Sequence, residues 1–238
     1  MRTCIAEYLG LVPYEPALKL QHRLAQARAE DVIPDALLLL QHPPVYTIGR
    51  FHGEKDIISP PEILSQEGIA VFPTSRGGSI TYHGPGQLVG YPILNLKELK
   101  LGVRQYIWKL EEVIIRLLRD LGIQGERVAQ YPGVWVGEKK MCSVGIHVSR
   151  SITTHGFALN VSTNLHHFAY INPCGIPGAI MTSITEVLGH PIQVESVIEP
   201  LLPHFSAVFE VNLEVPLLGR DTFPPLPDTL STLTSPAG

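Results

Sequence analysis

Apolar positions follow a helical spacing in three segments of the chain. In residues 16–30 and 103–121 they recur every three or four positions, which predicts two amphipathic helices. Gly122 follows the second segment directly and is typical of a helix end. Residues 194–209 predict a third helix, and we expect an interruption at Pro203 because proline lacks a backbone donor.

Short apolar runs bounded by turn residues predict strands between these helices. The predicted strands cover residues 4–9, 36–41, 45–48, 134–136, 142–149 and 156–161. Gly137-Glu138 predicts a turn between two of them. Because helices and strands do not alternate regularly, the pattern favours an α+β fold in a single domain, residues 1–218. The Pro/Ser/Thr-rich residues 219–238 predict a flexible tail.

The composition argues against several classes of function. The 238 residues carry a net charge of −4 with a pI near 6.2, and the basic residues are scattered, so nucleic acid is not an expected partner. No apolar run approaches the roughly 18 residues that span a bilayer, and the start lacks the apolar core of a signal peptide. We therefore expect a cytoplasmic protein without a membrane partner.

One segment, residues 76–87, combines glycines with one arginine, one histidine and several hydroxyls. Glycines allow backbone to approach a ligand closely, and Arg76 or His83 can hold an anion or polarise a carbonyl. A tight hairpin rich in turn residues is an equally good interpretation of the composition alone. The segment lacks both the Gly-Lys-Ser/Thr ending and the Gly-x-Gly-x-x-Gly pattern of nucleotide-binding loops.

Cysteine chemistry is the second candidate feature. Cys174 lies between Pro173 and Gly175, which predicts a loop position for its sulfur. A catalytic thiol needs a cation or a base nearby, and the candidates are Lys140, His83 and His155. The other two cysteines, Cys4 and Cys142, are expected to be small buried hydrophobes. No Cys-x-x-Cys or His-Glu-x-x-His pattern supports a metal site.

Five blocks in order resemble the lipoyl (octanoyl) transferases of lipoate biosynthesis. They read LLLQHPPVYTIGR at 38–50, RGGSITYHGPGQ at 76–87, KMCSVG at 140–145, HGFALNV at 155–161 and INPCG at 171–175. The resemblance covers roughly residues 35–190. It implies the α+β catalytic fold of biotin and lipoate protein ligases, with a mixed sheet flanked by helices.

The resemblance also implies an active site. Cys174 corresponds to the acyl-accepting nucleophile and Lys140 to the lysine that lowers its pKa. Backbone amides near Gly77, Gly78 or Gly175 are candidates to stabilise the tetrahedral intermediate. The glycine-rich block, the Ser143-Val144-Gly145 turn and the block after His155 correspond to the acyl pocket. Its expected residues are Arg76, Gly77, Gly78, Ser79, Ile80, Thr81, Tyr82, His83, Ser143, Val144, Gly145, Gly156, Phe157 and Ala158.

The implied reaction moves an octanoyl group from acyl carrier protein to a lysine of lipoyl domains, through a thioester and without cofactor or metal. Lipoyl domains of 2-oxoacid dehydrogenase subunits and the glycine cleavage H protein are the implied acceptors. Because the carrier is acidic, a basic docking patch is expected among Lys19, Arg23, Lys139 and Arg150. Two alternatives remain: an ATP-dependent lipoate or biotin protein ligase, and a non-catalytic module that binds acyl carrier protein.

Overall fold

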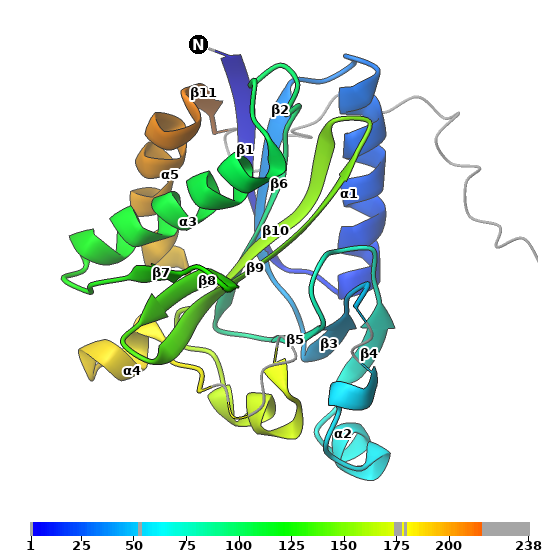
Figure 1. Ribbon diagram of the computed structural model, residues 1–238, viewed down its shortest axis with the longest axis vertical. Helices are drawn as coiled ribbons and strands as arrows, with labels where there is room; N and C mark the ends of the chain where they lie inside the picture. Colours follow the sequence, from blue (N-terminus) through cyan, green and yellow to red (C-terminus); the bar gives the residue numbers. More distant parts are fainter. Residues whose placement is uncertain (1, 52–53, 174–177, 179, 216–238) are drawn as a thin grey trace, which may run out of the picture.

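A mixed sheet with helices on both faces forms the body of the protein (Figure 1). The computed structural model describes residues 2–51, 54–173, 178 and 180–215. Cys174 and the predicted tail, 219–238, lie outside the described residues. In the described part no helix is long and apolar enough to cross a membrane.

The large sheet has eight strands in the order β11-β1-β2-β6-β10-β9-β8-β7. Strand β1 runs parallel to both of its neighbours, and every other pair is antiparallel, so the sheet is mixed. The strands are β1 (Arg2–Leu11), β2 (Asp35–Gln41), β6 (Gln87–Ile93), β7 (Glu126–Val128), β8 (Tyr131–Val136), β9 (Lys139–Ser149), β10 (Ile152–Asn160) and β11 (Val211–Glu214).

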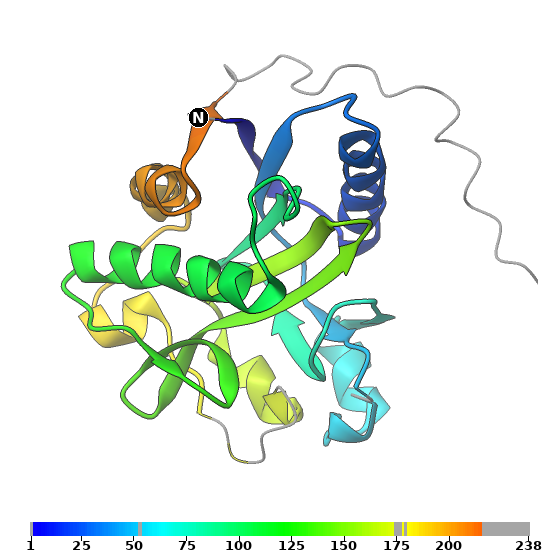
Figure 2. The ribbon, with the colours of Figure 1, turned by 45° about the horizontal axis from the view of Figure 1, so that its top comes forward.

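Helices cover the two faces of this sheet because its strands are apolar on both sides. Helix α1 (Tyr14–Ala29) lies on one face, and α3 (Val103–Asp120) and α5 (Glu195–Phe209) lie on the other (Figure 2). Alternate residues of each central strand divide between the two sides. On β10, Phe157 and Leu159 belong to the core under α3 and α5, whereas Ala158 belongs to the core under α1.

A smaller sheet packs beside the large one, in the order β4-β3-β5. It comprises β3 (Val45–Ile48), β4 (Ala70–Pro73) and β5 (Ile80–His83). Its apolar side packs against short helical segments, and together they form a third core that is distinct from the two main cores. These segments and the remaining helix are η1 (Glu54–Asp56), α2 (Pro61–Gln66), η2 (Leu165–Tyr170) and α4 (Ile184–Leu188).

The predicted α+β class and the main helices are confirmed, with boundaries within two residues for the first two helices. The predicted interruption at Pro203 is wrong, because α5 continues through Pro200 and Pro203. A proline inside a helix costs about 3 kcal/mol. Burial of an apolar face against α3 offsets that cost; its buried residues are Val197, Leu201, Phe205, Val208 and Phe209.

Candidate active site

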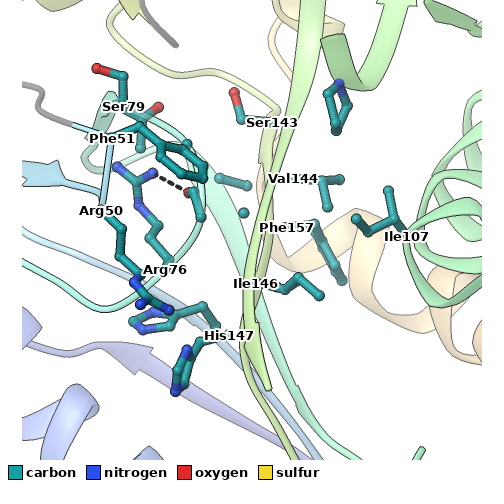
Figure 3. Close-up of a pocket in the computed structure, with 18 of the residues that line it drawn as sticks. Arg50, Phe51, Arg76, Ser79, Ile107, Ser143, Val144, Ile146, His147 and Phe157 are labelled. Carbon is teal, nitrogen blue, oxygen red and sulfur yellow. Dashed lines mark hydrogen bonds between the residues drawn. The ribbon is translucent and has the colours of Figure 1, made fainter. Parts of the chain in front are cut away.

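A cavity of about 900 Å³ opens along β9, between the loop before β5 and the start of α3. Figure 3 shows two different walls on the two sides of this strand. Val144, Ile146, Phe157 and Ile107 form an apolar wall on the side of α3, and Arg50, Phe51 and Arg76 lie opposite. An apolar pocket with a few converging polar groups is the usual form of a small-molecule site.

Most of the predicted pocket residues line this cavity, but not all of them. Ile80 and Tyr82 point away from it and pack in the core of the small sheet, because side chains alternate along β5. Their neighbours Thr81 and His83 line the cavity, together with Arg76, Gly77, Gly78, Ser79, Gly156, Phe157 and Ala158. The glycine-rich block is therefore a loop followed by a strand, not a tight hairpin.

The Ser143-Val144-Gly145 segment also lines the cavity, but the expected turn is wrong. All three residues lie within β9, where Ser143 pairs with Ala158 and Gly145 with Gly156. A Cβ atom on Gly145 would lie only 3.2 Å from the carbonyl oxygen of Gly77. Glycine at this position therefore lets the 76–78 loop lie directly on the strand.

Arg76 holds the loop against the small sheet. Its Nε donates to Thr47 Oγ1 at 3.1 Å, and its Nη1 donates to the carbonyl of Gly77 at 3.0 Å. The Gly77 N–H donates to the carbonyl of Ile146 on β9 at 2.9 Å. That amide is thus already engaged, which leaves Gly78 as a candidate donor for a substrate carbonyl; the third candidate, Gly175, lies outside the described residues.

The two candidate histidines are buried and neutral at physiological pH. Burial lowers the pKa of His83 well below its usual value, and its Nδ1 lies 2.7 Å from Gln87 Oε1. Burial lowers the pKa of His155 to about 3, and the nearby positive charge of Arg76 adds to the effect. His155 also has a φ of +57°, which is uncommon for a residue other than glycine.

Lys140 occupies the first part of β9 and is 2% exposed. Its backbone N–H donates to Ile180 and its carbonyl accepts from Thr182, both at 2.9 Å, so the chain that follows the Cys174 segment returns beside it. Its Nζ lies 5.5 Å from the centre of the Trp135 ring. The structure brings Lys140 to the wall of the cavity; the position of Cys174 is outside the described residues.

Cys4 and Cys142 are buried, as predicted. Burial raises the pKa of Cys142 to about 12, although the charge of Lys140 acts in the opposite direction. Cys142 is therefore a poor nucleophile at neutral pH.

Within the described residues, no cluster of three or more His, Cys, Asp or Glu side chains could hold a metal ion.

Residue patterns did not indicate several other lining side chains. Tyr14 comes from α1, Tyr91 from β6 and Tyr131 from β8, so they meet only when the sheet assembles. Strand alternation was the available signal for Ile146 and Val148, and the amphipathic pattern of α3 was the signal for Val103 and Ile107.

In the expected docking patch, Lys19 forms an ion pair of 2.8 Å with Glu15, and Lys139 forms one of 2.8 Å with Glu186.

The fold and the cavity define a class of protein. A bipartite lipoate protein ligase from Thermoplasma acidophilum has a TM-score of 0.72 and 16% identity, over 97% of this chain and 91% of that one. A biotin protein ligase from Aquifex aeolicus, solved with biotin and ATP, has a TM-score of 0.52 and 17% identity, over 86% and 70%. The protein therefore has the catalytic fold of lipoate and biotin protein ligases.

Sequence relatives then define the family. The lipoyl protein ligase A/B catalytic domain matches residues 13–206. An octanoyltransferase of Solibacter usitatus is 46% identical, covering 90% of this chain and 96% of the relative. An octanoyltransferase of Caldicellulosiruptor saccharolyticus is 48% identical, covering 85% and 87%. The chain belongs to the lipoyl protein ligase A/B catalytic domain family, and the predicted resemblance is confirmed.

Proposed function

We propose that this protein is an octanoyltransferase that moves an octanoyl group from acyl carrier protein to a lysine of lipoyl domains. The observation that carries the proposal is the buried Lys140 at the wall of a largely apolar cavity, in a chain that is 46% identical to a named octanoyltransferase. An apolar wall suits a medium-length acyl chain, and a buried amine beside it suits activation of a thiol.

The proposed nucleophile is Cys174, which precedes Ile180 by six positions along the chain. Its thiolate attacks the thioester carbonyl of the donor, and the collapse of the tetrahedral intermediate expels the carrier thiolate, which then takes up a proton. The acceptor lysine, as a neutral amine, attacks the new thioester, loses a proton and expels the Cys174 thiolate. The first step breaks one thioester and forms another of similar energy, so its equilibrium constant is close to one.

Lys140 acts on the thiol in either of two ways under this proposal. As an ammonium it stabilises the thiolate electrostatically, and as a neutral amine it accepts the thiol proton. Both roles lower the pKa of the nucleophile. The low pKa of His155 and the hydrogen bond of His83 to Gln87 make these imidazoles weaker candidates for the base.

The test is the intact mass of the protein after incubation with octanoyl-acyl carrier protein, without ATP. We expect one octanoyl adduct that is absent from Cys174→Ser, present on Cys142→Ser and discharged by a lipoyl domain. Cys142→Ser is the matched control because Cys142 is buried close to Lys140. Absence of any adduct on the wild-type protein would contradict the proposal.

An ATP-dependent ligase is the second candidate, because the solved lipoate and biotin protein ligases share this fold. Such an enzyme would activate a free acid as its adenylate and would retain activity in Cys174→Ser. Lipoylation or octanoylation of a lipoyl domain that requires ATP and Mg²⁺ and survives this substitution would favour the ligase.

A further inference from the structure

A carboxylate is buried beneath the candidate active site, on the apolar face of α3. Glu111 is 7% exposed and belongs to the buried residues of α3, which contacts β8 and β9. A buried carboxylate is costly unless it is paired or hydrogen-bonded. The groups that offset this cost are the ones that support Lys140.

Gly133 on β8 joins Glu111 to Lys140. Its N–H donates a hydrogen bond of 2.8 Å to Glu111 Oε1. On its other side, a Cβ atom built on Gly133 would lie 2.7 Å from Lys140 Cε, so the lysine side chain lies directly against this glycine. Gly133 has a φ of +135°, a conformation that only glycine adopts easily. The carboxylate and the lysine thus contact the same peptide unit.

Two positive charges, on β7 and β9, act on Glu111. Arg127, in β7, places Nε 3.3 Å from Glu111 Oε2, and its guanidinium stacks over Trp108 at 4.3 Å. Burial raises the pKa of Glu111, while the Gly133 hydrogen bond and the charges of Arg127 and Lys140 lower it. The charge of Lys140, on β9, also lowers the pKa of Cys142, whose thiol is buried.

We propose that Glu111 is a positioning residue of the active site, which fixes the Gly133 backbone under the Lys140 side chain and supplies the negative charge that stabilises the Lys140 ammonium. This inference rests on the proposed role of Lys140 in acyl transfer. Glu111 does not touch the substrate; it acts through the lysine. Two carboxylates of α3 therefore differ in function, because Glu112 pairs only with Arg116 and Arg127 among the described contacts.

The test compares Glu111→Gln with Glu111→Asp in the full-length protein. Glutamine keeps an oxygen that accepts from the Gly133 N–H but removes the charge, whereas aspartate keeps the charge on a shorter side chain. The measurement is the pH dependence of kcat/KM for octanoyl transfer. The limb of interest is defined by experiment, as the one that changes in Lys140→Arg.

In Glu111→Gln we expect this limb to move to lower pH by about one unit, because an ammonium loses its proton more readily when a nearby negative charge is removed. In Glu111→Asp we expect the limb near its wild-type position and a severalfold lower rate at all pH values. Glu112→Gln, which removes a neighbouring carboxylate from the same helix, is the control and is expected to leave the limb unchanged.

An unchanged limb in a folded Glu111→Gln would overturn the inference, as would an equal shift in Glu112→Gln. If Glu111→Gln does not fold, Arg127→Gln provides the second test. Removing this nearby positive charge should move the limb to higher pH, and no shift would equally overturn the inference. The octanoyl adduct on the wild-type protein is measured in parallel: its absence contradicts the proposed function itself, whereas its presence with unshifted limbs contradicts only the role of Glu111.

Discussion

The ring of Phe157 on β10 occupies the space that Gly90 leaves on the neighbouring strand β6, where the two residues are directly paired. A Cβ atom on Gly90 would collide with the ring of Phe157. The apolar wall of the cavity therefore depends on a residue that does not line it. A packed interior yields little to an added methyl group, so the ring has to move.

Gly90→Ala is predicted to destabilise the protein by about 1–3 kcal/mol, the usual cost of overpacking. Urea denaturation measures the change in the free energy of unfolding. Gly90→Ala combined with Phe157→Leu should be less unstable than the sum of the two single changes, because the smaller side chain relieves the collision. Additive effects in this cycle would contradict the proposed contact.

Arg76→Lys is predicted to lower both stability and octanoyl transfer. Lysine cannot replace the donors that reach Thr47 and the Gly77 carbonyl together, and lost hydrogen bonds of a charged group cost about 1.5–3 kcal/mol. Thermal denaturation and kcat/KM measure the two effects. Arg23→Lys, on the exposed side of α1, is the control for stability and should change it by less than about 0.5 kcal/mol. A fully active Arg76→Lys would contradict the role of Arg76 in holding the loop against the small sheet.

Thiol labelling is predicted to discriminate the cysteines. Since burial raises the pKa of Cys142 to about 12, its reactive thiolate is scarce at pH 8. Brief treatment of the folded protein with iodoacetamide, followed by peptide mass analysis, should leave Cys4 and Cys142 unmodified and modify Cys174. Unfolding in urea should expose all three cysteines. Rapid modification of Cys142 in the folded protein would show that the cavity wall opens.

Stability is predicted to fall in mild acid. Burial lowers the pKa of His155 to about 3 and that of His42 to about 4, whereas an unfolded histidine titrates near 6.5. The unfolded chain therefore binds protons that the folded protein excludes. The free energy of unfolding should be fully retained above pH 6.5 and decrease from there toward pH 3–4, by up to about 1.4 kcal/mol per pH unit for each histidine.

Urea denaturation at pH 7.5 and pH 5.5 measures this acid sensitivity. His155→Asn is the matched variant, because asparagine tolerates the positive φ of this position and does not titrate. It should show a smaller loss of stability between the two pH values than the wild-type protein. An identical loss in both proteins would mean that His155 does not contribute.

Local pattern predicted much of the fold, and the family resemblance predicted most of the cavity residues. The segment 103–121 carries an apolar stripe strong enough to define α3, and the alternation of 142–149 and 156–161 defines the central strands β9 and β10. The glycine-rich block led to Arg76 and His83 because these side chains can hold an anion or polarise a carbonyl, although the composition alone fitted a tight hairpin equally well. In each case neighbours along the chain decide the structure.

The remaining features depend on contacts between distant segments. The continuation of α5 through Pro203 is decided by packing against α3, and the inward position of Tyr91 follows from the pairing of β6 with β2 and β10. Glu111 is a clear example, because its position on an amphipathic helix gives no sign of the β8 backbone that it contacts. Helix packing decides the first of these features and strand pairing the other two, and the pattern of a single element specifies neither.

The pairing of β1 with β11 has a consequence for the order of folding. It joins residues 2–5 to residues 211–214, so the edge of the large sheet is closed by the last strand of the described domain. During synthesis β1 leaves the ribosome early and its outer edge stays unpaired until nearly the whole domain has emerged. An unpaired parallel edge is a template for association with other chains. Chains that stop short of residue 211 should therefore aggregate, even though every residue of the cavity described here is present in them.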